Sequence, residues 1–170
     1  MLNMKITESM VSGIGGAIGI FLLSILTFSS DAPLLMAPFG ASCVLLFSVP
    51  GSPLSQPKNV IGGHLISSLV GVVFVYMWPV TPVTLALAVA LAITLMSLMK
   101  VTHPPAGADP IVILLGAKGF SFLIFPVLSG SILLVVVAFI FHRMTKLHTY
   151  PTLKTAQTNK PLQRSTNTLT

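Results

Sequence analysis

Long, nearly uninterrupted apolar runs dominate the chain, and most polar positions lie between them. The runs of span length are residues 10–28, 59–78, 82–100 and 121–142. About 20 apolar residues cross the hydrocarbon core as a helix, so the pattern predicts an all-α integral membrane protein. In the second run small residues recur at every fourth position, at Gly63, Ser67 and Gly71. This spacing lets membrane helices pack closely.

Two further segments, 33–49 and 103–118, are too apolar for ordinary loops, yet proline and glycine prevent either from forming one helix. The interruptions are Pro38-Phe39-Gly40 in the first segment and His103-Pro104-Pro105-Ala106-Gly107 in the second. Two topologies fit. In the first topology, each segment dips into the membrane and returns, which gives four crossings. In the second, each segment crosses as an extended stretch plus a half-helix, which gives six.

A short phrase is repeated in these two segments. The copies are Pro38-Phe39-Gly40-Ala41-Ser42 and Pro105-Ala106-Gly107-Ala108-Asp109. We call the separation between their first positions, 38 and 105, the repeat offset. An apolar run too short to span a bilayer follows each copy. Pro/Gly-interrupted segments at matching places in two halves of a membrane protein point to a mid-membrane binding site made of broken helices.

The length of the second segment permits a crossing. An extended stretch from His103 to Ala108 covers about 20 Å at roughly 3.3 Å per residue. A helix from Asp109 to Ala117 adds about 13 Å. Together they slightly exceed the roughly 30 Å of the hydrocarbon core.

The basic residues favour six crossings. With the N-terminus inside, six crossings leave only Lys118 outside, whereas four also leave Lys58 and Lys100 outside, and cytoplasmic loops collect Lys and Arg. The halves, about 8–79 and 80–146, then contain three segments each, and the second enters from the opposite side. We therefore expect an inverted repeat with both termini cytoplasmic.

Composition agrees with a membrane protein. Of the 170 residues, 54% are hydrophobic and 7% are charged, which is too few charges for a soluble domain of this size. The net charge of +6 does not indicate nucleic-acid binding, because five of the nine basic residues follow residue 142 and flank the membrane. We expect residues 1–150 to form a transmembrane domain and 151–170 a disordered polar tail.

The first apolar run predicts a retained helix in a bacterial cytoplasmic membrane. It follows Lys5 and Glu8, has span length rather than the length of a signal-peptide core, and no A-x-A cleavage site follows it. The single cysteine, Cys43, lies in an apolar run, where we expect a buried, unreactive thiol.

In the six-crossing topology, each broken segment places a half-helix N-terminus near mid-membrane. Free backbone N–H groups there would point into a shared cavity and bind an anion. The residues concerned are Gly40, Ala41, Ser42, Gly107, Ala108 and Asp109. In the alternative interpretation, the side chains of Ser42 and Asp109 cap their helices.

Two histidines are further candidates. His103 precedes two prolines, which hold it on extended backbone. It could donate a hydrogen bond to an anion, take up a proton during transport, or be an interfacial histidine bonded to backbone. His64, beside two glycines, is a candidate lining residue. Gln56, Lys58 and Lys100 are expected at the pore mouth, although a lysine at a helix end also snorkels to the interface.

Metal and enzyme chemistry find little support in the spacing of residues. His64, His103 and Asp109 are possible metal ligands, but the chain has no H-x-x-x-H or H-E-x-x-H pattern and no second cysteine. It also has no G-x-S-x-G or P-loop pattern. We therefore expect no enzyme activity, no metal and no cofactor.

Several strings of the sequence are specific when taken together. They are Pro38-Phe39-Gly40-Ala41-Ser42, Leu46-Phe47, Pro50-Gly51-Ser52-Pro53-Leu54-Ser55-Gln56-Pro57-Lys58-Asn59-Val60-Ile61-Gly62-Gly63-His64 and His103-Pro104-Pro105-Ala106-Gly107-Ala108. With them the chain resembles the HPP family of integral membrane proteins, from about residue 10 to Tyr150-Pro151. Plant chloroplast and cyanobacterial members transport nitrite, so the resemblance implies a nitrite-like anion. The family is usually described as having four transmembrane helices.

One position departs from the family pattern. Asp109-Pro110 follows the second motif where many members have a small residue or threonine. An acid at this place disfavours an anion unless it is neutral or turned away as a cap.

Three functional hypotheses follow. The leading one is a transporter or channel for nitrite or a similar small anion. The second is a pore for a neutral small solute, and the third is a membrane scaffold that transports nothing. We expect a lipid bilayer and a small anion as partners, with no nucleic acid. A homo-oligomer is expected because four to six short spans make a thin wall for a pore.

Overall fold

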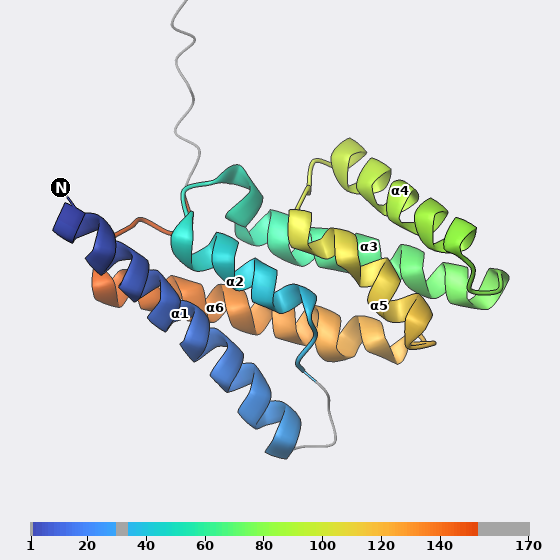
Figure 1. The fold of residues 1–170 in the computed structure, drawn as a ribbon, viewed down its shortest axis with the longest axis horizontal. Helices are drawn as coiled ribbons and strands as arrows, with labels where there is room; N and C mark the ends of the chain where they lie inside the picture. The colour runs from blue at the N-terminus through green and yellow to red at the C-terminus, as the bar shows by residue number, and fades with distance from the viewer. Residues whose placement is uncertain (1, 30–33, 153–170) are drawn as a thin grey trace, which may run out of the picture.

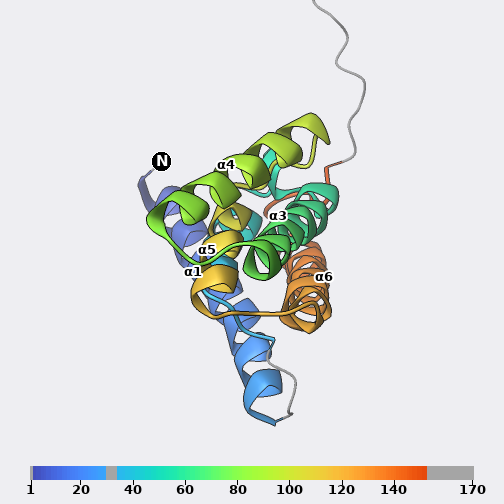
Figure 2. The ribbon, with the colours of Figure 1, turned by 90° about the vertical axis from the view of Figure 1, so that its right-hand side faces the viewer.

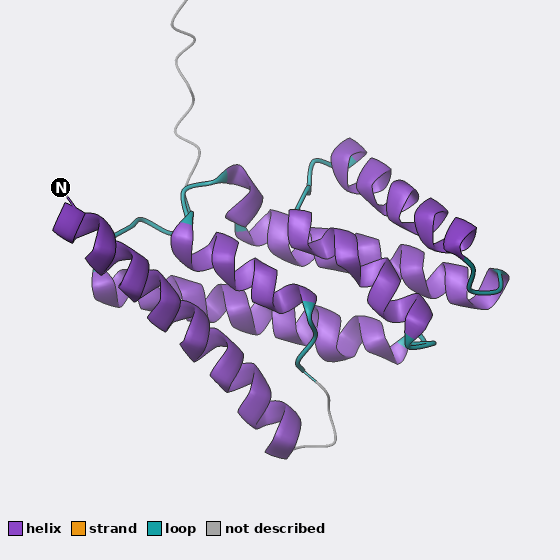
Figure 3. Cartoon of the chain, in the orientation of Figure 1, coloured by secondary structure: helices purple, strands orange, loops and turns teal. Residues whose placement is uncertain are grey.

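The computed structural model of the chain describes residues 2–29 and 34–152, with side chains from residue 6 onward. Its elements are α1 (Leu2–Ser29), α2 (Pro38–Ser48), η1 (Pro53–Ser55), α3 (Pro57–Met77), α4 (Pro82–Leu98), η2 (Pro104–Ala108), α5 (Asp109–Leu115), η3 (Leu123–Leu128) and α6 (Ser129–Thr145). Every regular element in these ranges is helical (Figures 1 and 3), which confirms the all-α prediction. The expected polar tail lies outside the described residues from residue 153 onward.

Three helices are long and apolar enough to cross a membrane: Ile6–Ser29, Pro57–Met77 and Leu123–Thr145. They correspond to three of the four expected runs. The fourth run forms α4, whose 17 residues are short for a perpendicular crossing, because a helix rises only about 1.5 Å per residue. The two broken segments form shorter apolar helices, α2 and the continuous pair η2–α5.

Proline marks the starts of several helices. Prolines in a first helical turn include Pro38, Pro57, Pro82 and Pro104. At that position the missing N–H is no loss, and the fixed φ of proline suits a helix. The start of α4 is fixed further by a capping box, in which the hydroxyls of Thr81 and Thr84 each accept the other residue's backbone N–H.

The second broken segment differs from its prediction. An extended stretch from His103 to Ala108 was expected, but Pro104–Ala108 is a 3-10 helix that leads directly into α5. Only His103 itself is extended, with φ −134° and ψ 102°. The two prolines explain the difference, because the fixed φ of proline fits a helical turn as well as an extended chain. In the first segment, residues Leu34–Met36 are irregular and a turn at Ala37 leads into α2, which begins at Pro38 and includes Phe39 and Gly40.

The long helices run in alternating directions along the chain (Figure 1). α3 and α6 lie side by side in one layer, α5 packs on α3, and α2 packs on α6 (Figures 1 and 2). α1 and α4 lie on the outside of the bundle. α1 packs on α2 and α6, and α4 packs on α3 and α5. The larger core joins α1, α2 and α6 through buried side chains such as Leu23, Phe47 and Leu134.

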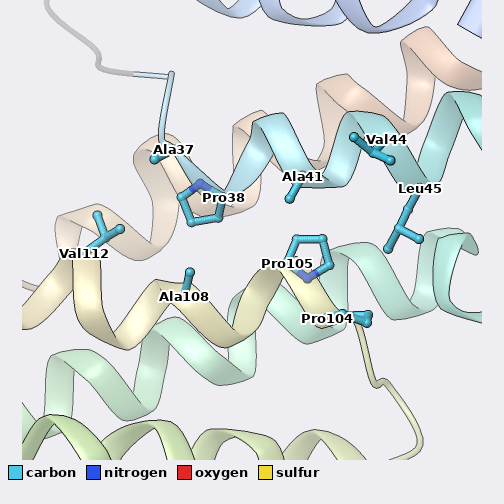
Figure 4. A pocket seen from close by; sticks show the side chains of 9 residues that line it. All are labelled: Ala37, Pro38, Ala41, Val44, Leu45, Pro104, Pro105, Ala108 and Val112. Carbon is cyan, nitrogen blue, oxygen red and sulfur yellow. The ribbon is translucent and has the colours of Figure 1, made fainter. Parts of the chain in front are cut away.

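Helices in the two halves match at the repeat offset. When the repeat offset is added to the residue numbers of α2, the result is 105–115, and η2–α5 covers Pro104–Leu115. Shifting α3 gives 124–144, and η3–α6 covers Leu123–Thr145. The helices of each matched pair run in opposite directions, as the order of the labels along α2 and η2–α5 in Figure 4 makes plain.

The same offset relates two close packing contacts. A Cβ atom on Gly63 would lie 2.9 Å from the carbonyl oxygen of Val101, and one on Gly130 would lie 2.9 Å from that of Leu34. The glycines (63 to 130) and the carbonyls (34 to 101) are each separated by one repeat offset. Each long helix thus packs closely on the residues that lead into the broken segment of the other half.

Candidate functional site

Buried polar side chains from three segments meet at the hydroxyl of Ser42. This residue lies in the second turn of α2, and its Oγ is 2.8 Å from His64 Nε2 and 2.9 Å from His103 Nε2. The same oxygen is 3.3 Å from the carbonyl oxygen of Pro38 in its own helix. His64 comes from α3 and His103 from the residue before η2, so the first half and the second half of the chain share this point.

Asp109 extends the contact at the start of α5. Its Oδ2 lies 2.8 Å from His64 Nδ1 and accepts the hydroxyl of Ser68 at 3.1 Å. Its Oδ1 is buried without a partner among the described residues. Asp109 is 1% exposed, and the other members of the cluster are fully buried. We call Ser42, His64, His103 and Asp109 the polar chain.

The polar chain ends at the loop before α3. His103 Nδ1 lies 2.8 Å from the carbonyl oxygen of Leu54. A carbonyl oxygen can only accept, so Nδ1 carries a hydrogen and donates it. When His103 is neutral, its Nε2 is therefore an acceptor that faces Ser42.

Small residues on α3 allow the second broken segment to approach it. A Cβ on Gly63 would lie 2.7 Å from the Cβ of His103, so only glycine fits there. Ser67 donates its hydroxyl to the Ala106 carbonyl at 2.6 Å, and Gly71 packs against α5. The stripe of small residues expected from the sequence is thus the surface on which η2–α5 rests.

The remaining expected binding residues lie outside the polar chain. Gly40 and Ala41 are exposed, whereas Gly107 and Ala108 are half-buried. Ala41 and Ala108 line an apolar groove of about 630 Å³ between α2 and η2–α5 (Figure 4). The lining residues are Ala37, Pro38, Ala41, Val44, Leu45, Pro104, Pro105, Ala108 and Val112.

The two halves contribute matching positions to this groove. The lining pairs that are separated by one repeat offset are Ala37 with Pro104, Pro38 with Pro105, Ala41 with Ala108 and Leu45 with Val112. Because α2 and η2–α5 run in opposite directions, Pro38 lies opposite Ala108 and Ala41 lies opposite Pro105 across the groove (Figure 4).

Two of the backbone N–H groups that we expected to be free, those of Gly40 and Asp109, have backbone acceptors. The N–H of Gly40 donates to the Ala37 carbonyl at 3.1 Å, and the N–H of Asp109 donates to the Ala106 carbonyl. A tight turn before each helix supplies these acceptors. The capping alternative is also wrong, because α2 and α5 have no side-chain cap and the side chains of Ser42 and Asp109 belong to the polar chain.

The residues expected at a pore mouth divide into two kinds. Gln56 holds its own loop together, because its amide N–H groups donate to the carbonyls of Pro50 and Ser52. Lys58 and Lys100 are exposed. Lys100 ends α4 in a left-handed conformation with φ 56°.

Sequence reasoning did not identify Ser68 or the carbonyl of Leu54 as parts of the site. The position of Ser68 carried a signal, because it lies four residues after His64 and so on the same helix face. Nothing in the sequence singled out Leu54, since any residue supplies a carbonyl.

The polar chain suits proton transfer better than nucleophilic or metal chemistry. Its Ser42–His64–Asp109 contacts follow the order of a hydrolase triad. However, Ser42 is fully buried and also contacts a second imidazole, so it cannot reach an acyl carbon. In the part of the chain that the structure describes, no three His, Cys, Asp or Glu side chains are grouped to hold a metal ion.

Comparison with known proteins identifies the family. The sequence matches the family described as HPP, transmembrane region, over residues 1–151. One transmembrane protein of Dictyostelium discoideum is 38% identical over 152 residues, which cover 82% of this chain and 49% of that protein. A second from the same organism is 35% identical over 145 residues, covering 78% of this chain and 51% of that protein. No solved structure matches the chain.

This chain spans about half the length of the curated relatives that it matches. Their names describe them only as transmembrane proteins. The family match covers nearly all of the described residues, including both broken segments and the polar chain. The chain is therefore a membrane protein of the HPP transmembrane family.

Proposed function

We propose that this chain is a membrane transporter or channel for a small anion such as nitrite, with its site where α2 and η2–α5 meet. The observation that carries the proposal is the buried polar chain. Asp109 bonds to Ser68, which lies near the middle of α3 (Pro57–Met77), so a carboxylate sits at the centre of a span. Ionisable residues at that depth are costly, and they typically mark solute or proton pathways.

An inverted repeat supports a transport function. We infer it from the matched helices of opposite direction, the paired glycine contacts and the paired groove positions. Inverted repeats commonly bind substrate between their halves near mid-membrane, and rocking of one half against the other gives alternating access. The groove between α2 and η2–α5 lies at that place.

The six-crossing topology is supported by contacts between loops. Hydrogen bonds join Tyr150 to Ser55 and Asn59 to Thr102, so these loops share one end of the molecule, with Lys58 beside them. The opposite end holds Lys118 together with Tyr76 and Phe120, whose rings stack at 5.3 Å. This distribution agrees with a cytoplasmic Lys58 end.

The chemistry of the site supports an anion only if Asp109 is neutralised. The other polar groups of the site are two imidazoles and the Ser42 hydroxyl, which bond to one another. A neutral small solute is the second candidate, and the apolar lining of the groove favours it. The preference for nitrite rests on the family resemblance. We also propose a homo-oligomer and a bacterial cytoplasmic membrane, the latter because α1 has span length.

Flux into proteoliposomes tests the proposal. We expect uptake of nitrite, nitrate, formate or chloride above protein-free vesicles, and loss of that uptake in His64→Phe. His142→Gln is the matched control, because His142 is a buried histidine bonded to the Leu46 carbonyl outside the polar chain. Uptake of urea without any anion would favour the neutral-solute pore. Absence of all flux from a correctly inserted protein would refute a transport function.

A further inference from the structure

We propose that the polar chain is a relay that holds one transferable proton and couples its movement to the anion. The inference rests on the proposed function, but it comes from a separate argument, the count of hydrogens available to the Ser42 hydroxyl. Proton relays in membrane transporters are commonly built from histidine and carboxylate side chains.

The hydroxyl of Ser42 has one hydrogen but two imidazole neighbours. Its Oγ lies 2.8 and 2.9 Å from the Nε2 atoms of His64 and His103. At most one Nε2 can accept that hydrogen, so the other must carry a hydrogen of its own and donate it. Otherwise two lone pairs would face each other in a buried site, which is costly.

This requirement fixes the charge of the cluster. His103 already carries a hydrogen on Nδ1, because that atom faces the Leu54 carbonyl. A hydrogen on its Nε2 as well makes it a cation beside the Asp109 carboxylate. A hydrogen on His64 Nε2 instead requires a second proton on the His64–Asp109 pair, whose Nδ1 and Oδ2 lie 2.8 Å apart. In both arrangements the cluster is neutral and holds one proton more than a carboxylate with two neutral imidazoles.

A polar chain with fewer or more protons does not satisfy these hydrogen bonds as well. Without the extra proton, one Nε2 contact has no hydrogen. With two extra protons, either both imidazoles are cations with ring centres only 4.9 Å apart, or Asp109 is neutral and His103 is a cation without a counter-charge. Both Nε2 atoms then donate to Ser42, whose own hydrogen is left with the longer 3.3 Å contact to Pro38. In either case the cluster has a buried net positive charge, which is unfavourable.

The two neutral arrangements interconvert by a short proton shift. His64 gives its Nε2 proton to Ser42 Oγ while Ser42 gives its own hydrogen to His103 Nε2. If the proton began on Asp109, that carboxyl transfers it to His64 Nδ1 in the same direction. From His64, one N–H and one O–H bond break while one O–H and one N–H bond form. The transfer from Asp109 breaks one more O–H bond and forms one more N–H bond, so the cluster gains or loses no atom or net charge.

The relay has two distinct ends. At mid-membrane, Oδ1 of Asp109, which has no partner among the described residues, is where a proton donor can bind. At the Lys58 end, His103 bonds to Leu54, which is partly exposed in its loop. The other titratable neighbour, Cys43, faces Gly19 of α1 instead.

The coupling between proton and anion follows from the net charge of the polar chain. The deprotonated cluster carries a net negative charge beside the anion path, and it repels an anion strongly in a low-dielectric site. The protonated cluster is neutral and lacks this repulsion. An anion therefore binds more tightly when the proton is present, and by linkage the anion also favours proton binding.

Transport by the wild-type protein tests the coupling. With an acidic exterior, we expect the initial uptake of nitrate to exceed that at equal pH, with one proton entering per anion. A one-unit pH gradient should then support about tenfold accumulation, independent of membrane potential. Nitrate is the preferred probe because nitric acid is a strong acid and is almost completely ionised near neutral pH, so little neutral acid is present to diffuse through the lipid. Nitrate uptake that ignores the pH gradient and carries no protons would overturn the relay and leave the proposed function standing.

Two variants separate the relay from the fold. Ser42→Ala and His103→Gln should abolish proton uptake and flatten the pH dependence of any remaining anion flux, whereas His142→Gln should keep both. Nitrogen-15 NMR of the histidine side chains in lipid gives a readout that does not depend on flux. We expect one proton shared between the Nε2 atoms of His64 and His103. Two bare or two protonated Nε2 atoms would overturn the proposal even if no solute moved.

Discussion

Four glycines provide a sharp test of the packing between the two halves. Gly63 in α3 and Gly130 in α6 are separated by one repeat offset, and each faces a backbone carbonyl of the opposite half. Gly40 and Gly107 are separated by the same offset, but a Cβ at either would meet nothing within 4 Å. The four Gly→Ala variants therefore make the same chemical change in two closed and two open surroundings.

The expected magnitude follows from the distances. Carbon atoms pack at about 3.5–4.0 Å, yet the Cβ of Gly63→Ala would lie 2.7 Å from the Cβ of His103 and 2.9 Å from the Val101 carbonyl. In Gly130→Ala the new methyl would meet the Phe39 ring and the Leu34 carbonyl. Overpacking of this kind costs about 1–3 kcal/mol. Alanine in an open helical position instead gains up to about 1 kcal/mol over glycine.

Thermal unfolding in detergent micelles measures the difference. For a chain of this length, about 2 kcal/mol corresponds to a midpoint shift of roughly 4–8 °C. We expect Gly63→Ala and Gly130→Ala to unfold at lower temperature by about this amount, and Gly40→Ala and Gly107→Ala to match or exceed the wild type. Equal unfolding midpoints for all four variants would show that the two halves do not pack as described, and would therefore contradict the proposed repeat.

Two further predictions concern topology and the Lys58 end. In a Cys43→Ser background, single cysteines at positions 58 and 100 should label only from the cytoplasm and one at position 118 only from outside; external labelling at 58 and 100 would establish four crossings. Tyr150→Phe should lower the free energy of unfolding by about 1 kcal/mol, because the Tyr150 hydroxyl donates to the Ser55 carbonyl at 3.0 Å. Burial raises the pKa of the Tyr150 phenol, so the protonated donor is favoured in the folded state, and the stability difference in chemical denaturation should persist up to about pH 10, the ordinary tyrosine value; a difference that disappears at neutral pH would contradict this role.

The sequence predicted the helical class and the places where helices break, because run length and proline have direct local consequences. Pro38 and Pro104 begin their helices, and the small residues of α3 mark a close contact. The sequence could not decide the backbone between His103 and Ala108, since proline fits both a turn and an extended chain. That choice depends on tertiary contacts such as the bond from Ser67 to the Ala106 carbonyl.

Four of the residues expected to bind substrate lie together in the polar chain, but the sequence did not predict how they are arranged. His64, His103, Ser42 and Asp109 stood out because polar side chains are rare in so apolar a chain. The expectation that backbone N–H groups would form the site was wrong for Gly40 and Asp109, because short turns provide their acceptors. Hydrogen-bond partners of this kind depend on residues brought together by folding, which spacing along the chain does not reveal.

The proposed repeat and the polar chain together would give the proposed site a direction. Ser42 and Asp109 are at matching positions of the repeat, yet both bond to His64. The position that matches His64 is Ser131, which bonds to a carbonyl of its own helix turn, and the position that matches His103 is the buried Met36. Both titratable imidazoles therefore lie on the Lys58 side of Asp109, and the matching route towards the Lys118 end has none. In the proposed transporter, rocking between two states would expose the groove to either side in turn, whereas the proposed relay leads from mid-membrane towards the Lys58 end. A coupled transporter must release the proton on the side opposite to its entry, and such a relay would supply the release route, which a simple pore does not need.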